Sequence, residues 1–402
     1  MAEHTIRLLG PWEWEAQACT AWRADGQIEI LPDPLPQPRR IWIPVRAADE
    51  SWARFRGRVL WRRHFHWTSE LDYWERIWLY FEAADYFARV RVNGVELGQH
   101  EGALDPFSFP ITPLLQKRNC LEVELEIPAT PPSLAQAKRM LRETPACRDG
   151  PAILGEVRLE VFHPARFGDL IVWSEFHEGK ALLHVAGDIL AESDCQPEVY
   201  VVYDNHTLHY ERLEVKGGRQ PLAVVVPCPR VFIWDVAQGS PAALHYVQVE
   251  LVDRSVLLDA RYCHVGFRRL RWHAAKRMFH LNKHWLTPGT DVPLVDIQSP
   301  ICEGKPFEQA DEVGQPLVCR LPLRGGYASE ESFRRRAVHQ AVRLVQLLQH
   351  HPCILGWIVH TEPAEHDRQL DIDLLQAVRQ TDPSRPAFLQ PNAESAELIE
   401  TP

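Results

Sequence analysis

The 402-residue chain lacks the features of membrane-spanning, secreted and disulfide-stapled proteins. It has no run of 18 apolar residues, and its first residues are acidic and aromatic where a secretory signal needs a basic start and an apolar core. Its nine cysteines are odd in number and have no C-x-x-C spacing, which is typical of reduced thiols. The sequence therefore predicts a soluble, cytoplasmic protein without a membrane segment.

Basic stripes and metal motifs are missing too. The net charge is -10 and the basic patches, at 268–271 and 334–336, are short, which argues against a nucleic-acid partner. One segment is rich in histidine, but its spacings match neither H-E-x-x-H nor a zinc finger. Its members are His350, His351, His360 and His366. We expect no metal site and no cofactor.

What the chain does have is length, proline and tryptophan. A prior of roughly 150 residues per domain predicts about three domains. The 32 prolines favour extended segments and turns, and residues 32–44 are expected to form an extended lead-in rather than a helix. The 14 tryptophans suit either sugar-stacking surfaces or a core.

Two blocks of short β-rich runs fill the first two thirds of the chain. Residues 55–163 alternate such runs with turn signals, and Asn93-Gly94 between two of them predicts a tight hairpin. Residues 164–265 show the same pattern at the spacing of a small sandwich. Both blocks are therefore predicted to be antiparallel β-sandwiches, and the second holds no constellation of catalytic type.

After Gly266 the pattern changes to strands that alternate with helices, which indicates βα units and a parallel sheet. The expected strands are 293–297, 316–322, 353–359 and 386–390, and the expected helices are 305–313, 330–349 and 368–380. Ser329 is the expected N-cap of the long helix. Its apolar face should hold Phe333, Ala337, Ala341, Leu344, Val345 and Leu348, and that of the last helix Leu370, Ile372, Leu375 and Val378.

The strand at 353–359 leads to a lone carboxylate, Glu362, followed at once by Pro363. The apolar run is typical of a strand buried on both faces, and parallel α/β folds gather their chemistry at the carboxyl ends of such strands. Glu362 is therefore a candidate acid/base group. The alternative is that it merely starts the next loop.

A series of motifs resembles glycoside hydrolase family 2, the family of β-galactosidases, β-mannosidases and β-glucuronidases. In the first block these are Phe55-x-Gly57, Trp61-Arg62-Arg63-x-Phe65, residues 81–102, Pro106-Phe107-x-Phe109-x-Ile111-Thr112 and Asn119-x-Leu121-x-Val123. In the second they are Trp234, Gly239, Pro241, Leu244-x-Tyr246 and Gly266-Phe267-Arg268. In the third they are Asp311-Glu312-x-Gly314, Pro322-Leu323-x-Gly325-Gly326-Tyr327, His351-Pro352-x-Ile354-x-x-Trp357 and Asp382-Pro383-x-Arg385-Pro386.

The resemblance implies a multidomain fold that combines β and α/β parts. The expected domains are a jelly-roll β-sandwich at 1–163, an immunoglobulin-like β-sandwich at 164–266 and a TIM-type (β/α) barrel at 267–402. Only about 136 residues follow Gly266, whereas a full barrel takes roughly 250, so the barrel is expected to be incomplete.

The resemblance also implies roles at the end of the Glu362 strand. Glu362 corresponds to the family's general acid/base, and Thr361, Asp296 and Trp357 are expected to contact substrate. Thr361 stands where the family has an asparagine, and Asp296 stands where it usually has an arginine. Asp296 is an anion, so it would raise the proton affinity of a nearby carboxylate. A retaining enzyme needs a second carboxylate as nucleophile. None was found, since Glu394, Glu397 and Glu400 are expected to lie in a solvated tail.

These residues predict a carbohydrate-active protein that acts on or binds β-glycosides and is inactive on its own. The alternative is a non-catalytic protein that binds carbohydrate or another protein, or a scaffold subunit. Half a barrel would leave an exposed sheet edge and apolar faces. We therefore also expect a second copy, a partner chain or the chain's own sandwiches to cover the third domain.

Overall fold

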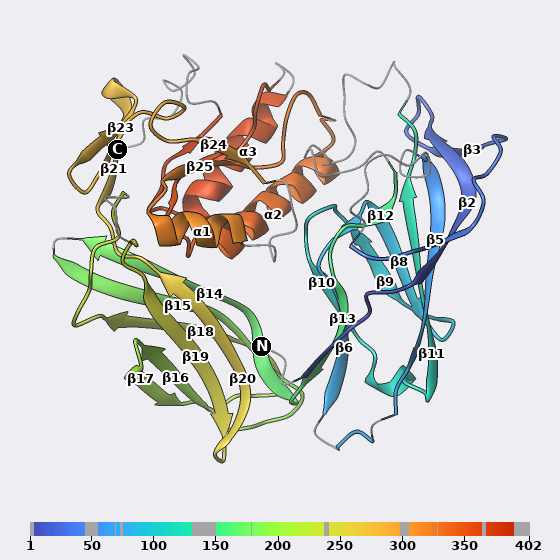
Figure 1. The fold of residues 1–402 in the computed structure, drawn as a ribbon, viewed down its shortest axis with the longest axis horizontal. Coiled ribbons are helices and arrows are strands. Elements are labelled where there is room, and N and C mark those ends of the chain that lie inside the picture. The colour runs from blue at the N-terminus through green and yellow to red at the C-terminus, as the bar shows by residue number, and fades with distance from the viewer. Residues whose placement is uncertain are drawn as a thin grey trace.

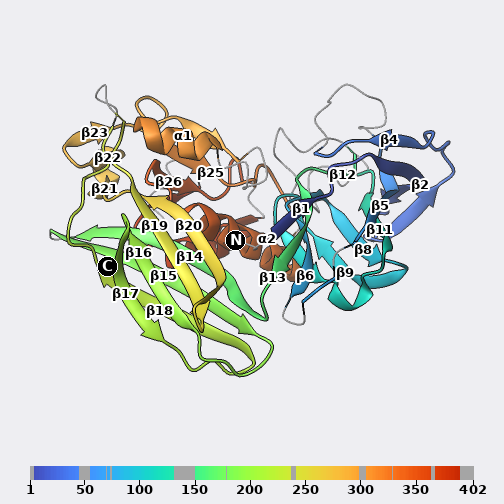
Figure 2. The ribbon, with the colours of Figure 1, turned by 60° about the horizontal axis from the view of Figure 1, so that its bottom comes forward.

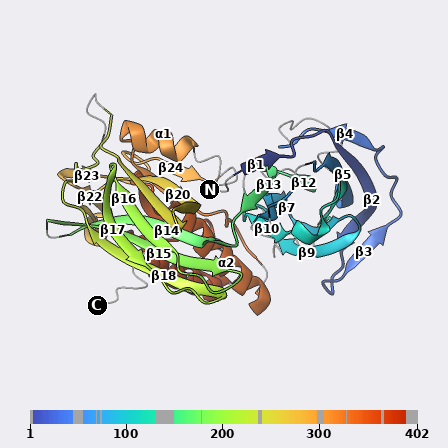
Figure 3. The same cartoon turned by 90° about the horizontal axis from the view of Figure 1, so that it is seen from below.

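The computed structural model describes residues 4–44, 55–68, 70–72, 75–130, 150–177, 179–236, 241–297, 305–327, 329–363 and 367–389. Two groups of strands and one group of helices beside a parallel sheet make up the molecule (Figure 1). The views in Figure 2 and Figure 3 show that helix α2 lies between the two strand groups.

The first strand group is a β-sandwich. One sheet, in the order β1-β13-β6-β10, is formed by β1 (His4–Arg7), β13 (Val157–Phe162), β6 (Arg76–Phe81) and β10 (Phe107–Pro110). The other, in the order β3-β2-β5-β11-β8-β9 with β4 also beside β2, is formed by β3 (Ile28–Leu31), β2 (Trp12–Trp22), β5 (Gly57–His66), β11 (Arg118–Ile127), β8 (Phe87–Val92), β9 (Val95–Glu101) and β4 (Arg39–Ile41). A short pair joins β7 (Ala84–Asp85) to β12 (Ala152–Ile153).

Strand alternation builds the core of this sandwich. In β11 every second residue is buried, and Leu121, Val123 and Leu125 belong to one apolar cluster that draws on both sheets. Strand β2 was not expected, because the N-terminal segment was predicted only as a lead-in. Trp12 and Trp14 are nevertheless fully buried in it. Their alternation with glutamate marks a half-buried strand.

The predicted hairpin at Asn93-Gly94 is confirmed. Both residues have positive φ, 52° and 80°, and they join β8 to β9 as a two-residue turn. Positive φ at both central positions is the geometry for which the Asn-Gly pair is selected.

The second strand group is also a β-sandwich, as predicted for residues 164–265. One sheet, in the order β14-β15-β18, is formed by β14 (Ala165–His177), β15 (Lys180–Ala191) and β18 (Gly218–Pro227). The other, in the order β17-β16-β19-β20, is formed by β17 (His206–Arg212), β16 (Glu198–Tyr203), β19 (His245–Asp253) and β20 (Val256–Val265). Buried residues of both sheets form a second apolar cluster.

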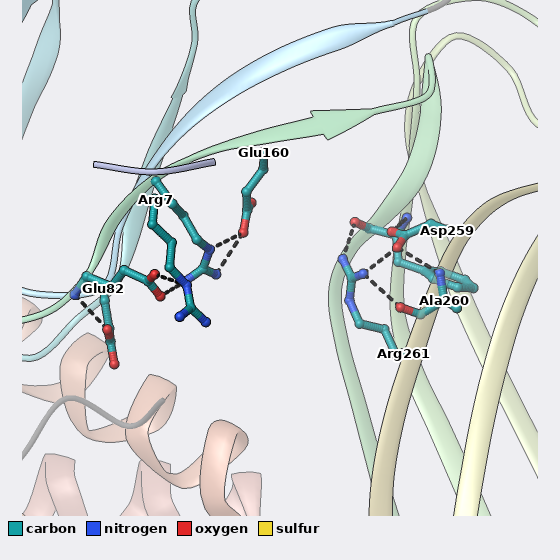
Figure 4. Close-up of polar contacts among 9 residues, drawn as sticks. Arg7, Glu82, Glu160, Asp259, Ala260 and Arg261 are labelled. Atoms are coloured by element: carbon teal, nitrogen blue, oxygen red, sulfur yellow. Dashed lines mark hydrogen bonds and ion pairs between the residues drawn. The ribbon is translucent and has the colours of Figure 1, made fainter. Parts of the chain in front are cut away.

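Carboxylates bond the backbone of another segment within each sandwich (Figure 4). In the first, Glu82 accepts the backbone N–H of Glu156 at 2.7 Å. In the second, Asp259 accepts the backbone N–H of Phe167 at 3.0 Å and pairs with Arg261. Each carboxylate thus gives a backbone N–H of another segment an acceptor.

The last part of the chain is the predicted parallel α/β unit. An antiparallel sheet of β21 (Leu270–His273), β22 (Met278–Leu281) and β23 (His284–Leu286) leads into a parallel sheet in the order β24-β25-β26-β27. Its elements, in chain order, are β24 (Leu294–Asp296), α1 (Lys305–Val313), β25 (Leu317–Arg320), α2 (Glu331–Leu348), β26 (Ile354–Ile358), α3 (Arg368–Thr381) and β27 (Ala387–Phe388).

The helix predictions hold with two corrections. All six residues predicted for the apolar face of α2 are buried, but the N-cap is Glu330 rather than Ser329, and its side chain makes no cap hydrogen bond. In α3 the buried positions include Asp371 and Leu374, whereas Ile372 is 38% exposed. Asp371 is buried because it bonds His360, a long-range contact that periodicity does not reveal.

Helix α2 contacts both sandwiches. Its Arg343 lies 3.1 Å from Asp169 of the second sandwich and 4.0 Å from Asp105 of the first. Apolar packing is shared as well, since Tyr86 of the first sandwich and Trp234, which follows β18, belong to the same apolar cluster as the parallel sheet. The three parts therefore pack through common side chains.

Candidate functional site

The candidate site lies at the carboxyl ends of the parallel strands. Asp296 ends β24 and stands beside Arg320, the last residue of β25, in the sheet register. Arg320 in turn stands beside Ile358 at the end of β26, and Glu362 follows four residues later. Because parallel strands end at the same edge, these side chains are brought to one side of the sheet.

Backbone pairing beyond β26 holds Thr361 in place. Its N–H donates to the carbonyl of Leu323 at 2.9 Å, and its carbonyl accepts the N–H of Gly325 at 2.8 Å. The loop after β25 thus runs alongside the residues after β26, with Arg324 opposite Thr361. These bonds fix the backbone immediately before Glu362.

Glu362 has an unusual backbone and a close cationic partner. Its φ is +55°, a left-handed conformation that costs a non-glycine residue about 1–3 kcal/mol and that clusters at functional sites. Arg324 donates from Nε to Oε2 at 3.3 Å and from Nη2 to Oε1 at 3.1 Å. The hydrogen bond to Glu362, and then its charge, raise the pKa of Arg324. Both side chains are more than half exposed, so a ligand can reach them.

Asp296 is also paired with an arginine. Arg320 lies 2.7 Å from it through Nε and 2.8 Å through Nη2. The charge of Asp296 also adds to the raised pKa of Arg324, so the two ion pairs act on each other. In the sequence, Asp296 stands at a position where the resembled family usually has an arginine. The structure supplies two cations from β25 and its loop, Arg320 beside Asp296 and Arg324 beside Glu362.

Trp357 and His360 support the strand from within. Trp357 is fully buried, and its indole N–H donates to Asp382 at 2.9 Å. His360 is also fully buried, with Asp371 2.7 Å from Nδ1 and the carbonyl of Gly325 2.7 Å from Nε2. Neither ring offers a free surface to a ligand in this arrangement. Both position the backbone that leads to Glu362.

Sequence reasoning missed the two arginines. Arg324 occupies the unspecified position of the motif at 322–327, and only its location next to Glu362 reveals its importance. Its backbone N–H donates to the hydroxyl of Tyr327 at 3.0 Å, and burial raises the pKa of Tyr327 well above its ordinary value. Arg320 carried a weak signal, since it ends a predicted strand.

Within the described ranges no group of three or more His, Cys, Asp or Glu side chains could hold a metal ion. His351 instead bonds Asp311 at 2.6 Å. Four residues considered above, namely His366, Glu394, Glu397 and Glu400, lie outside the described part of the chain. No described helix combines the length and apolar character needed to cross a membrane.

Comparison with known proteins supports the resemblance. Residues 45–156 match the family model described as "Glycosyl hydrolase 2 galactose-binding domain-like". A β-glucuronidase of Formosa agariphila is 37% identical over 68 residues, which cover 17% of this chain and 6% of that protein.

Solved structures match over the length of the chain. A putative β-galactosidase from Bacteroides fragilis has a TM-score of 0.76 at 15% identity and covers 96% of this chain, which spans 63% of that structure. A calcium-binding mutant of β-glucuronidase 2 from Bacteroides uniformis has a TM-score of 0.74 at 17% identity, with 96% and 52% covered. The β-D-mannosidase from Dictyoglomus thermophilum has a TM-score of 0.73 at 15% identity, with 96% and 57% covered.

At this level of identity the solved structures show a common fold, and this chain spans between about half and two thirds of their length. The sequence motifs, the family model and the fold agree with one another. Residues 45–156 are therefore similar to the glycosyl hydrolase 2 galactose-binding domain-like family, and the chain shares the fold of these β-galactosidase, β-glucuronidase and β-mannosidase structures.

Proposed function

We propose that this chain is a carbohydrate-active protein that acts on or binds β-glycosides, with Glu362 as the acid/base group. The observation that carries the proposal is the strained backbone of Glu362, φ +55°, at the carboxyl end of β26. A carboxylate in this position can protonate the glycosidic oxygen as the bond to the sugar breaks.

The substrate-binding roles of Thr361 and Asp296 are part of the same proposal. Asp296 and Arg320 form a pair at the neighbouring strand end, where a sugar bound beside Glu362 would meet them. The ring of Trp357 is buried, so the proposal gives this residue no contact with substrate. Its role in the proposal is to hold the strand that leads to Glu362. Hydrolysis with retention also needs a nucleophile about 5–5.5 Å from the acid/base group, which the proposal does not assign.

The alternative is a non-catalytic protein that binds carbohydrate or another protein. One observation favours it: both oxygens of Glu362 are bonded to Arg324, an arrangement made by a carboxylate rather than by a protonated acid. A general acid must carry a proton when it meets the leaving oxygen, so Arg324 would have to release Glu362 first.

Aryl β-glycosides test the proposal. We expect Glu362→Gln to lower the rate on β-galactosides, β-mannosides or β-glucuronides about 10²–10⁴-fold, because the amide cannot transfer the proton. The measurement is the release of the aryl group by the purified chain. Glu331→Gln serves as the control, since this exposed carboxylate lies in the first turn of α2, and it should leave the rate unchanged.

Equal, background-level rates in the parent and Glu362→Gln would sink the catalytic proposal. The binding alternative then predicts that the same glycosides raise the melting temperature of both proteins. Catalysis that survives the Glu362→Gln change would show that another residue supplies the proton.

The finer architecture is also proposed. We propose the jelly-roll domain at 1–163, the immunoglobulin-like domain at 164–266 and TIM-type (β/α) barrel units at 267–402, supported by sheets that do not cross these boundaries. β24 and β27 are the outer strands of the described parallel sheet. A second copy, a partner chain or the chain's own sandwiches would cover them. A monodisperse monomer by light scattering that binds little hydrophobic dye would exclude the first two.

A further inference from the structure

The small antiparallel sheet β21-β22-β23 lies in a part of the chain that has no carboxylate. Between Asp259 and Asp291 the sequence has no aspartate or glutamate, although the whole chain has 54 of them and a net charge of -10. Five basic side chains of this segment are exposed, namely Arg269, Arg271, Lys276, Arg277 and Lys283. Together with the ring of Trp285 we call them the basic face. Figure 1 shows this sheet at the outer end of the molecule, away from the first sandwich.

The fold joins basic residues that are separate along the chain. Lys276 and Arg277 lie in the turn between β21 and β22. Lys283 lies in the turn between β22 and β23, at the opposite end of the sheet. Arg271 lies between the two turns, in β21. The short basic patch at 268–271 is therefore part of a larger basic surface.

Nearby carboxylates do not neutralise this surface. None of the five basic side chains forms an ion pair within the described part of the chain. Asp235 lies 3.6 Å from His284, which points to the other side of the sheet from Trp285 because neighbouring residues of a strand alternate. Asp291 accepts the backbone N–H of Thr287 at 2.8 Å. The basic face keeps an excess of positive charge even when Asp291 is counted, and more distant acids are screened beyond about 8 Å at physiological salt.

Aromatic rings lie on the same face as the charges. Arg271, His280 and Trp285 are cross-strand partners in one row of the sheet. The centroid of the Trp285 ring lies 4.6 Å from that of His273 and 4.7 Å from that of His280. The Lys276 ammonium lies 4.1 Å from the same ring, and Trp285 is still 40% exposed. Because rings and cations are interleaved, a ligand can contact both at once.

The opposite face of the sheet is anchored in the core. Phe279 and Leu281 are fully buried and belong to the same apolar cluster as the parallel sheet. Trp272 packs against Phe279 at 4.9 Å and against Phe388 of β27 at 4.7 Å. The core therefore fixes the position of the sheet without using the rings and cations of the outer face.

We propose that the basic face binds single-stranded nucleic acid. Backbone phosphates would lie against the basic side chains, and a base would stack on the exposed part of Trp285. Anionic lipid would use the same charges but would need apolar side chains to insert, and Trp285 is the one exposed large apolar side chain among residues 268–286. The sequence argued against a nucleic-acid partner because its basic patches are short, but the turns of this sheet bring such patches together.

Fluorescence anisotropy of labelled oligo(dT) and oligo(rU), each of about 12 nucleotides, tests the site with the full chain. We expect a Kd on the order of 10 μM at low salt. The logarithm of the binding constant should fall with the logarithm of the salt concentration, by about 0.7 for each phosphate contacted. Arg271→Gln should therefore reduce this slope by about 0.7. Trp285→Ala should weaken binding about tenfold because it removes stacking, and Trp285→Phe should recover part of the loss.

Controls separate this site from general attraction of anions. Lys117→Gln removes an exposed cation of the first sandwich and should bind as the parent does, and so should Glu362→Gln, since the two sites share no residue. Thermal unfolding checks that each variant is folded. Absence of saturable binding would overturn the proposal. Binding that Trp285→Ala leaves unchanged would overturn it as well, since charge alone would then account for it. Tighter binding to vesicles that contain phosphatidylserine than to either oligonucleotide would instead assign the face to a membrane.

Discussion

Replacing Arg385 with methionine is expected to destabilise the parallel α/β unit by about 3–5 kcal/mol, the usual cost of breaking a buried ion pair from one side. The guanidinium is buried and donates to the carbonyls of Ile354, Gln349 and His351 at 2.7–3.0 Å. It also bonds Asp382 at 2.6 Å. Methionine fills the space but leaves a buried carboxylate and three carbonyls without this donor. Chemical unfolding followed by tryptophan fluorescence measures the loss.

The same substitution should change the pH dependence of stability. Burial acts to raise the pKa of Asp382, but Arg385 and hydrogen bonds from Ser384 and Trp357 outweigh it and lower the pKa. In the parent this carboxylate therefore contributes stability above about pH 4 that is lost as the pH falls through its lowered pKa. Without Arg385 the burial effect prevails, so the penalty should shrink as the pH falls toward 4.

Arg379→Met, in the preceding helix α3, is the matched control. This arginine is half-buried and makes one hydrogen bond of 3.3 Å, to the carbonyl of Ala387. We expect a loss of about 1 kcal/mol or less. Equal losses for Arg379→Met and Arg385→Met would contradict the view that the buried network dominates.

Gly57→Ala is expected to have a comparably large effect in the first sandwich. Gly57 has φ +145°, and a Cβ there would lie 2.1 Å from the carbonyl oxygen of Ala18 and 2.9 Å from the Cα of Cys19. These are backbone atoms of the paired strand β2, so they cannot swing aside as a flexible side chain does. Separating the strands would break hydrogen bonds worth roughly 1 kcal/mol each, and we expect a loss of about 3 kcal/mol or more.

Gly94→Ala is the control that separates the backbone strain of a positive φ from the steric clash of the added Cβ. Gly94 also has positive φ, +80°, but nothing lies within 4 Å of an added Cβ. We expect a loss of about 1 kcal/mol, from strain alone. Thermal unfolding of both variants measures the difference. A Gly57→Ala protein as stable as Gly94→Ala would show that β2 and β5 can separate at little cost.

Local pattern alone predicted much of the fold. The sequence predicted the strand alternation, the Asn93-Gly94 turn and the six-residue apolar face of α2, because each depends on residue spacing along one element. The change to alternating helices and strands after Gly266 predicted the parallel sheet for the same reason. The sequence also predicted the end of α1, because glycine often follows a helix in the left-handed conformation, and Gly314 has φ +68°.

The sequence predicted only part of the candidate site. A strand that ends in a carboxylate pointed to Glu362, but nothing in the sequence links Glu362 with Arg324 or Asp296 with Arg320. Those pairs depend on which strands neighbour each other and in what register. The buried place of Asp371 in α3 has the same origin, because its partner His360 lies on another element.

The sequence by itself therefore determined the kinds of elements, their order and the resemblance to glycoside hydrolase family 2, since these follow from residue spacing and motif. Only the tertiary structure decided which charges meet at the strand ends and why Gly57 cannot carry a side chain. Each of these depends on distances between segments far apart in the chain, and such distances arise only when the sheets and helices pack.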